Sequence, residues 1–136
     1  MAIPNCFYRV SIKAVIRNVD GKILLAKEHD GRRDLPGGWW DHGETIAQTI
    51  QREIQEELGV HWEITQHTPL GIRTIVRPPE WWEDEDIHVL IMAYETKISS
   101  SFFTPSSECE EVRFFSLSEL KDLNLHANAK WLIDEF

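Results

Sequence analysis

The chain has 136 residues, 42% of them hydrophobic and 10% aromatic, which is enough for one core, so we expect a single domain covering residues 1–136. Its net charge of -9, from 14 lysines and arginines against 23 aspartates and glutamates, argues against a protein that binds long nucleic acid through phosphate contacts. There is no run of 18 apolar residues and no charged-then-apolar leader, so a cytoplasmic protein without a membrane partner is expected.

The first predicted element is a half-buried strand at residues 8–17. Its apolar residues alternate with a mostly polar set, the period-two pattern of a strand with one face on the core. The apolar face consists of Tyr8, Val10, Ile12, Ala14 and Ile16, and the other face of Arg9, Ser11, Lys13, Val15 and Arg17. Asp20-Gly21 is a typical turn pair, so residues 22–27 are expected to return as the hairpin partner of this strand.

A glycine-rich loop and a helix are predicted next. Leu35-Pro36-Gly37-Gly38 indicates a turn whose paired glycines let the backbone come close to an ion or a phosphate. From residue 45 to residue 58 apolar side chains recur at helical spacing, which predicts an amphipathic helix that Gly59 ends. The apolar positions are Ile46, Ala47, Ile50, Ile54 and Leu58. At about 100° per residue they form one sector roughly 120° wide, which can pack on a sheet.

Three carboxylates border the buried side of this predicted helix. Glu57 projects into the apolar sector, and Glu53 and Glu56 lie on its edge. Acidic helix residues usually form a solvated surface, but a carboxylate that faces the core beside two like charges is costly unless a cation neutralises it. Mg²⁺ does this through a few carboxylates together with substrate phosphates. Arg52, adjacent to Glu53, is expected to orient the carboxylates.

Further strands and two short helices are predicted after Gly59. Residues 70–77 have a strand pattern, and residues 87–94 are nearly all apolar, as in a central strand covered on both faces. Residues 112–115 are another predicted strand. Ser116-Leu117-Ser118-Glu119 has the form of a capping box that opens a short helix. Residues 129–136 are expected to form a last helix.

Residues 78–86, PPEWWEDED, are the least regular part of the chain. The acidic residues fit an exposed loop, whereas the adjacent Trp81 and Trp82 point to opposite sides, so that one can pack on the core while the other lines a cleft. A nucleobase can stack on such a ring with a gain of roughly 1 to 3 kcal/mol. Candidate phosphate contacts, each with a plain surface role as the alternative, are Lys27, Arg32, Arg33, Arg73 and Arg77.

Residues 38–60, GWWDHGETIAQTIQREIQEELGV, fit one known spacing throughout: G-x5-E-x7-R-E-U-x-E-E-x-G-U, where U is aliphatic. The matching residues are Gly38, Glu44, Arg52, Glu53, Ile54, Glu56, Glu57, Gly59 and Val60. This spacing is the signature of the Nudix hydrolases, which the chain strongly resembles. The resemblance implies an α/β fold, the Nudix-type α/β/α sandwich with a mixed β-sheet. One position departs from many relatives: Trp39 stands where they carry a small residue, and it either narrows the freedom of the loop or contacts substrate.

The resemblance also implies an activity. It predicts a Mg²⁺-dependent pyrophosphohydrolase, with Mn²⁺ as a substitute, that cleaves a phosphoanhydride bond in a nucleoside diphosphate linked to another moiety. The candidates are nucleoside triphosphates, ADP-ribose, nucleotide sugars and dinucleoside polyphosphates. An acidic protein repels such anionic substrates, but bound divalent ions reverse the field at the site itself.

The site residues implied by the resemblance fall into three groups. The metal ligands are expected to be the carbonyl of Gly37 and the carboxylates of Glu53, Glu56 and Glu57. Glu53 is the first choice for activating the water, and Glu44 and Arg52 are expected to scaffold the motif. Some relatives supply a further acidic ligand or base near the positions of Glu110 and Glu111.

Two readings from other classes stay open. One is a nucleotide-binding regulatory module that does not hydrolyse its ligand, and the other is a structural protein that uses its acidic surface for assembly. Metal-dependent phosphate release from nucleotides separates both from an enzyme. The expected partner is a small nucleotide, and the protein is expected to be a monomer or a homodimer.

Overall fold

The computed structural model describes residues 6–28, 30–59, 63–99, 111–126 and 129–130. In chain order its elements are β1 (Arg9–Val15), β2 (Ile23–Lys27), β3 (Arg33–Asp34), β4 (Gly37–Trp39), α1 (Ile46–Leu58), β5 (Ile64–Arg77), β6 (Ile87–Ile98), β7 (Glu111–Phe115) and α2 (Leu117–Leu120). Of the last helix expected at residues 129–136, only Ala129 and Lys130 are described, and both are helical. Within the described ranges, no helix is long and apolar enough to cross a membrane.

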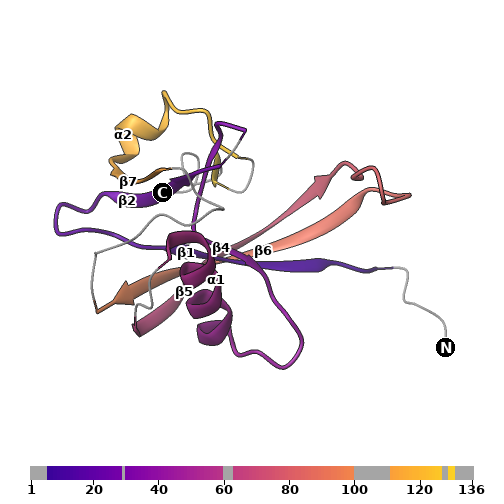
Figure 1. Cartoon of the computed structure of the whole chain (residues 1–136), viewed down its shortest axis with the longest axis horizontal. Coiled ribbons are helices and arrows are strands. Elements are labelled where there is room, and N and C mark those ends of the chain that lie inside the picture. Colours follow the sequence, from indigo (N-terminus) through magenta and orange to yellow (C-terminus); the bar gives the residue numbers. More distant parts are fainter. Residues whose placement is uncertain (1–5, 29, 60–62, 100–110, 127–128, 131–136) are drawn as a thin grey trace.

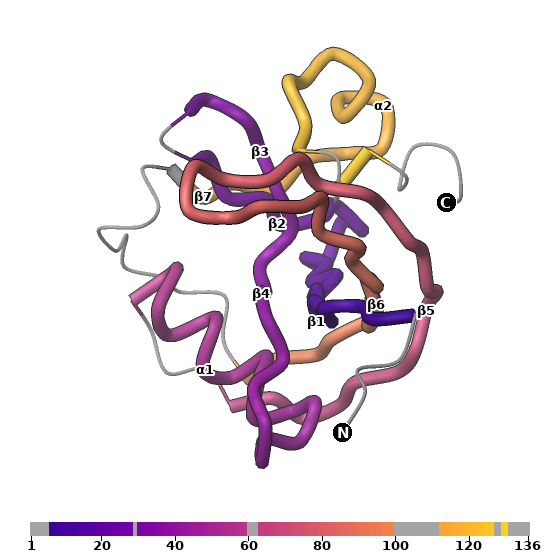
Figure 2. Tube along the Cα trace, turned by 90° about the vertical axis from the view of Figure 1, so that its right-hand side faces the viewer, coloured from indigo at the N-terminus to yellow at the C-terminus, as the bar shows by residue number. Residues whose placement is uncertain are grey.

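The strands form two sheets (Figure 1). One sheet has the order β4-β1-β6-β5, in which β1 and β6 are parallel and the other pairs antiparallel, and the second has the order β3-β2-β7. The fold is therefore a mixed α/β fold with a mixed sheet, as predicted. β5 and β6 form a long ribbon whose tip stands away from α2 and β7 (Figure 1). In Figure 2, β5 curves around the side of the molecule opposite α1.

The predicted helix is confirmed as α1, and both of its ends are capped. At the start, Thr45 accepts a hydrogen bond from the backbone amide of Gln48, and the Gln48 side chain accepts one from the amide of Thr45. This reciprocal capping box satisfies backbone donors that have no partner within the helix. At the end, Gly59 adopts φ 73° and donates to the carbonyl of Gln55, a left-handed conformation that glycine adopts without strain.

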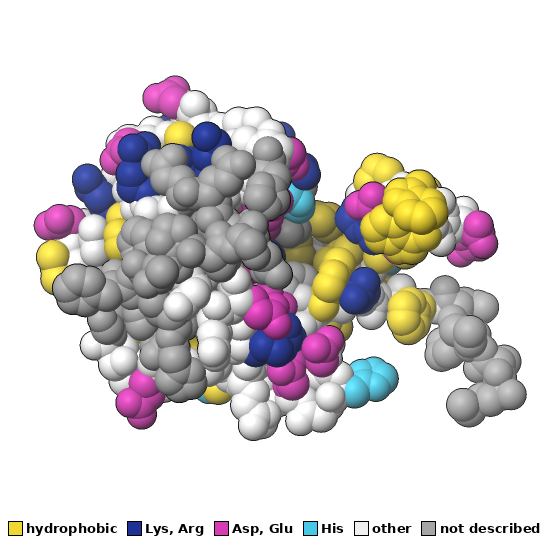
Figure 3. Space-filling view, in the orientation of Figure 1, with side chains coloured by type: hydrophobic (Ala, Val, Ile, Leu, Met, Phe, Trp, Pro, Cys, Tyr) yellow, Lys and Arg dark blue, Asp and Glu magenta, His cyan; other side chains and the backbone are white. Residues whose placement is uncertain are grey.

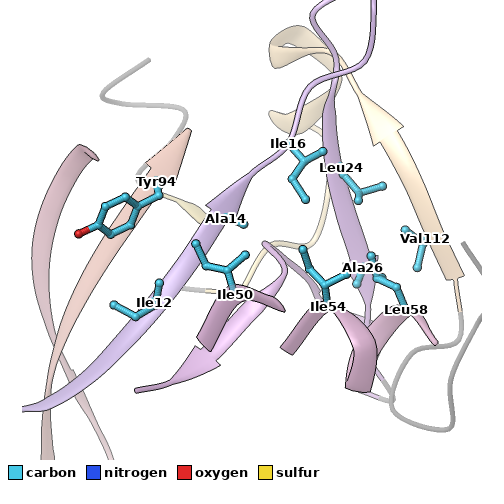
Figure 4. Packing of buried hydrophobic residues seen from close by; sticks show 10 residues of the cluster. All are labelled: Ile12, Ala14, Ile16, Leu24, Ala26, Ile50, Ile54, Leu58, Tyr94 and Val112. Atoms are coloured by element: carbon cyan, nitrogen blue, oxygen red, sulfur yellow. The ribbon is translucent and has the colours of Figure 1, made fainter. Parts of the chain in front are cut away.

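Buried side chains form two clusters on opposite faces of the strands. The first packs against α1 (Figure 4) and comprises Ile12, Ala14, Ile16, Leu24, Ala26, Ile50, Ile54, Leu58, Tyr94 and Val112. The second lies toward α2 and comprises Val15, Ile23, Leu25, Leu35, Phe115, Leu120, Leu125 and Ala129. Because successive residues of a strand point to opposite faces, β2 contributes alternately to the two clusters. Helical segments therefore cover both faces of this sheet, the layered order of a sandwich.

The predicted hairpin between the first two strands is only partly present. The turn forms, and the amide of Leu24 donates to the carbonyl of Ile16 at 2.9 Å. Beyond that bridge the strands separate, because β1 pairs with β4 and β6 while β2 pairs with β3 and β7. The expected hairpin is therefore present only next to the turn. Further along, each of the two strands pairs within a different sheet.

Two predictions about buried faces also need correction. Ser11 and Lys13, expected on the open face of the first strand, are both buried, because the second face of β1 is covered as well. β6 is central in its sheet, between β1 and β5. Val89 and Ile91 on one face are buried, and so are the consecutive residues Ala93 and Tyr94, whereas His88 is exposed. The prediction that both faces of this strand are covered is therefore confirmed around Tyr94 and wrong at the start of the strand, where His88 is exposed.

Candidate active site

The glycine loop, residues 35–38, was expected to be a turn, but its two glycines open β4 and pair with β1. α1 presses two of its carboxylates against these glycines. The amide of Gly37 donates to Oε1 of Glu57 at 3.3 Å. A Cβ on Gly38 would lie 2.5 Å from Oε1 of Glu53, and a Cβ on Gly37, where φ is 133°, would overlap the backbone of Ile12. A side chain is therefore excluded at Gly37, and at Gly38 it would displace the Glu53 carboxylate. The two glycines let the helix and β1 come close to this segment.

Burial makes both carboxylates electrostatically costly. Burial raises the pKa of Glu57 well above its ordinary value, Lys13 opposes this shift, and the nearby charge of Glu53 adds to it. Burial also raises the pKa of Glu53, against the effect of a hydrogen bond from Arg52. These directions are those of partly desolvated acids beside like charges. The predicted acidic border of the helix thus faces the loop and not open solvent.

Arg52 connects the acidic residues of the motif. Its Nε donates to Oε2 of Glu44 at 2.8 Å, and its Nη1 donates to Oε1 of Glu53 at 2.9 Å. Nη2 donates to Oε1 of Glu44 at 2.9 Å and to the carbonyl of Trp39 at 3.0 Å. The bond from Arg52 holds the pKa of Glu44 at about 2. A planar guanidinium that bridges two carboxylates fixes both orientations, which fits the scaffolding role expected for Arg52 and Glu44.

The third carboxylate of the motif does not join the other two. The Glu56 side chain is 46% exposed and lies 3.5 Å from Nη1 of Arg52. In the described part of the chain, no group of three or more His, Cys, Asp or Glu side chains is gathered closely enough to hold a metal ion. The structure therefore brings Glu53 and Glu57 to the glycine loop and leaves Glu56 at its rim.

Lys13 is a site residue that the sequence reasoning missed. Its Nζ donates to Oδ2 of Asp34 at 3.1 Å, to the carbonyl of Gly37 at 3.1 Å and to the carbonyl of Leu35 at 3.4 Å. Burial acts to lower the pKa of Lys13, but the charges of Asp34 and Glu57 outweigh it and raise that pKa. The alternating pattern of the first strand assigned Lys13 to the polar face, which was expected to be exposed to solvent. Only the pairing of Lys13 with Gly37 shows that it faces the site.

A cleft of about 620 Å³ opens beside the glycine loop. Its lining includes Gly38 and Trp39 of β4, Lys13 and Asp34, and the end of β5 with the segment after it, including Pro78. This volume is within the range of small-molecule sites. Figure 3 shows the tip of the β5–β6 ribbon, rich in hydrophobic side chains, standing away from the body of the molecule.

The candidate phosphate contacts are dispersed. Arg32 and Arg77 line the cleft, but Arg32 pairs with Asp30 at 2.7 Å and Arg77 pairs with Glu83 at 2.9 Å. Arg33 is buried and its guanidinium lies 4.7 Å from the ring centre of Phe115. The two remaining cations are Lys27 in β2, which is partly buried, and Arg73 in β5, which is exposed. A role in phosphate binding stays a prediction for each of the five.

Trp81 and Trp82 lie at the tip of the ribbon. They are 91% and 64% exposed and contact each other edge to face, with ring centres 5.4 Å apart. The described residues that line the cleft include neither of them. Base stacking on one of these rings stays an untested prediction.

The acidic pair predicted near the seventh strand is only partly described. Glu110 lies outside the described residues. Glu111 is the first residue of β7, opposite Lys27 in the pairing with β2. A role as metal ligand or base stays a prediction for both.

The fold and the site together define a mixed α/β domain in which a carboxylate-bearing helix meets a glycine loop. The family model described as NUDIX domain matches residues 7–136. The chain therefore belongs to the Nudix family, and it is a Nudix hydrolase, a nucleotide pyrophosphohydrolase.

Three known proteins illustrate the similarity. "Nucleoside triphosphatase NudI" of Enterobacter sp. (strain 638) is 27% identical over 126 residues, which cover 87% of this chain and 89% of that protein. The crystal structure of an ADP-ribose pyrophosphatase from Streptococcus suis 89-1591 is similar with a TM-score of 0.59 at 25% identity, covering 95% of this chain and 87% of that one. The MutT protein from Methanosarcina mazei Go1 shares the fold with a TM-score of 0.70 at 24% identity, covering 97% and 94%.

Proposed function

We propose that this protein is a Mg²⁺-dependent hydrolase of nucleoside triphosphates, with Mn²⁺ as a substitute. The observation that carries the proposal is the position of Glu53 and Glu57: two partly desolvated carboxylates lie against Gly37 and Gly38 at the edge of a cleft of about 620 Å³. The choice among nucleotides is supported by a relative that is named a nucleoside triphosphatase and matches 87% of this chain.

The chemistry of the donor set fits a divalent cation. Carboxylates and a backbone carbonyl are hard oxygen ligands of the kind that Mg²⁺ and Mn²⁺ prefer. A cation would relieve the cost of holding Glu53 and Glu57 among like charges. Glu56 is half-exposed, so it can reach the same ion by rotating its side chain. The carbonyl of Gly37 completes the expected set of Gly37, Glu53, Glu56 and Glu57.

The residues of the chain have separate tasks in the proposed reaction. A bound divalent ion supplies positive charge to the phosphoryl oxygens and acidifies water. Glu53 accepts the proton of the attacking water as its oxygen bonds to phosphorus and the bond from phosphorus to the leaving phosphate oxygen breaks. Arg52 holds Glu53 through a 2.9 Å bond and also holds Glu44, so the accepting oxygen is oriented before the substrate arrives.

The proposal also covers the location, the oligomeric state and the partners of the enzyme. The expectations of a cytoplasmic location, of a monomer or homodimer, and of no long nucleic acid or membrane partner rest on the charge and composition of the chain. The alternative of a regulatory module that binds a nucleotide without cutting it makes an opposite prediction for turnover.

The test is a hydrolysis panel of nucleoside triphosphates, ADP-ribose, nucleotide sugars and dinucleoside polyphosphates with Mg²⁺, with Mn²⁺ and with EDTA. We expect the highest kcat/KM with a nucleoside triphosphate, and no turnover in EDTA. Preference for ADP-ribose would contradict the substrate, and turnover that survives EDTA would contradict the metal. Binding without turnover of any member would favour the regulatory module.

A further inference from the structure

Trp39 joins the carboxylate site to the cleft. It is the last residue of β4, directly after the glycine that touches Glu53, and its carbonyl accepts the 3.0 Å bond from Arg52. Its side chain is among those that line the cleft. If a nucleotide places its phosphates near Glu53, the part of the ligand beyond the phosphates can therefore reach the Trp39 ring.

The ring of Trp39 is supported by Arg9. The guanidinium carbon of Arg9 lies 4.1 Å from the ring centre, a cation–π contact. Arg9 lines a neighbouring hollow together with Tyr8 and Trp40, whereas Trp39 lines the cleft. Arg9 covers one face of the ring, and a ligand in the cleft would stack on the other face.

Part of the lining of the cleft, called the proline wall below, is apolar. It includes Ile75, Val89 and the two prolines that follow β5, Pro78 and Pro79. The cleft also has a polar part, to which Ser11, Lys13 and Asp34 contribute. A nucleobase combines two flat apolar faces with an edge of hydrogen-bonding groups, so a cleft with both kinds of lining matches it.

The proline wall is held by its own ion pairs. Nη2 of Arg77 donates to both carboxylate oxygens of Glu83, at 2.9 and 3.1 Å, and Nη1 lies 3.4 Å from Glu80. The amide of Glu80 also donates to Glu83, at 2.9 Å. These contacts neutralise the charge of Arg77 and fix the segment after β5. Because Arg77 is already neutralised, this segment is better suited to pack against a flat ring than to bind a phosphate.

We propose that the nucleobase of the substrate stacks on Trp39 within this cleft, on the face of the ring that Arg9 leaves open, and that Arg9 is a positioning residue for the ring. The inference rests on the proposed function in that the ligand is a nucleotide. It assigns a binding role to the one position at which the motif departs from the small residue of many relatives. It also moves base recognition away from Trp81 and Trp82 at the exposed tip.

The test compares ligands that carry a base with one that lacks it. Dissociation constants are measured by titration calorimetry at a fixed Mg²⁺ concentration for the four nucleoside 5′-monophosphates and for ribose 5-phosphate. The variants are Trp39→Leu, Trp39→Phe and the matched control Trp82→Leu, with circular dichroism and melting temperature as checks of folding. The role of the Arg9 charge is tested with two further variants, Arg9→Gln, which removes the charge, and Arg9→Lys, which keeps it.

For the parent, we expect at least one nucleoside monophosphate to bind more tightly than ribose 5-phosphate. Trp39→Leu should raise the Kd of that nucleotide about 5- to 150-fold, the range for loss of one stacked base, and leave the Kd of ribose 5-phosphate unchanged. Trp39→Phe should retain most of the affinity, and Trp82→Leu all of it. Arg9→Gln should weaken nucleotide binding less than Trp39→Leu does, and Arg9→Lys should restore it.

Three results would overturn the proposal: parental affinity in Trp39→Leu, the loss appearing in Trp82→Leu instead, or a parent that binds every nucleotide no better than ribose 5-phosphate. The readout does not depend on turnover. If nucleoside triphosphates are not hydrolysed but binding still depends on Trp39, the proposed function fails and base stacking stands. If they are hydrolysed but nucleotide binding does not depend on Trp39, the proposed function stands and base stacking on Trp39 fails.

Discussion

The amide of Gly37 donates to Oε1 of Glu57, 20 residues later in the chain, at 3.3 Å. This contact ties the last turn of α1 to the glycine loop. Lys13, which donates to the carbonyl of Gly37 at 3.1 Å, reaches the same residue from β1. A buried carboxylate, a glycine and a buried lysine thus meet at one point, and the charge of Glu57 at that point has consequences for stability.

Glu57→Gln should not destabilise the metal-free protein. The amide oxygen of glutamine can still accept the bond from Gly37, whereas the desolvated charge beside Glu53 is removed. In EDTA we expect the variant to unfold at the same temperature as the parent or higher, by the equivalent of roughly 0 to 2 kcal/mol. Added Mg²⁺ should raise the melting temperature of the parent much more than that of the variant. A variant clearly less stable than the parent in EDTA would mean that the attraction between Glu57 and Lys13 outweighs the desolvation of the Glu57 charge.

The same residue predicts a pH dependence. The folded-state pKa of Glu57 is raised well above its ordinary value of 4.5, so in this range the folded protein binds more protons than the unfolded chain. The contribution of Glu57 to stability therefore falls as the pH rises from 4.5 through the raised folded pKa. In EDTA, the difference in unfolding free energy between Glu57→Gln and the parent should grow in favour of the variant over this window. A difference that stays constant with pH would show that the side chain titrates normally.

For Glu44 we expect the opposite pH dependence of stability. Its bond from Arg52 holds its pKa at about 2 instead of 4.5, so its stabilising contribution is complete above pH 4.5 and is lost as the pH falls toward 2. Glu44→Gln should therefore be less stable than the parent at pH 7, and the gap should close in acid. Glu63→Gln, at an exposed position outside the site, is the control for removing a negative charge. A gap that persists unchanged at pH 2 would rule out the ion pair as its cause.

Gly38→Ala should damage activity more than stability. A Cβ at this position would lie 2.5 to 2.8 Å from the carboxyl atoms of Glu53, which is the end of a flexible side chain and can move away. We expect kcat with a nucleoside triphosphate to fall about tenfold or more, since about 1.4 kcal/mol of lost orientation is enough for that, with little change in melting temperature. Parental kcat in a folded Gly38→Ala variant would contradict the placement of Glu53 against the loop.

Local patterns in the sequence predicted the parts of the fold that depend on local physics. The helix period and Gly59 predicted α1, and the capping box at Ser116 predicted α2, in which Ser116 accepts from the amide of Glu119. The inward position of Glu57 followed from its angle on the helix. In each case the signal lies within a few residues of the feature it predicts.

Features that depend on which strands pair could not be predicted in this way. The alternation in β1 shows two faces, but it does not reveal that β4 brings Gly37 opposite Lys13, so a buried lysine was expected in solvent. The turn at Gly21 was found, but the departure of β2 into a second sheet depends on β7, about 90 residues further along the chain. For the same reason, the sequence did not predict that Trp39 lines one cleft together with Ile75, Val89 and the prolines after β5.

The central claim is that Glu53, Glu56 and Glu57 hold the ion that hydrolysis requires. The most direct measurement is kcat for a nucleoside triphosphate over a Mg²⁺ titration, for the parent, for Glu56→Gln and Glu57→Gln, and for the control Glu63→Gln. Each of the two site variants should lose roughly 100-fold or more in kcat at saturating Mg²⁺, with an unchanged circular dichroism spectrum, and Glu63→Gln should match the parent. Near-parental kcat in either site variant would contradict the assignment of that residue to the metal.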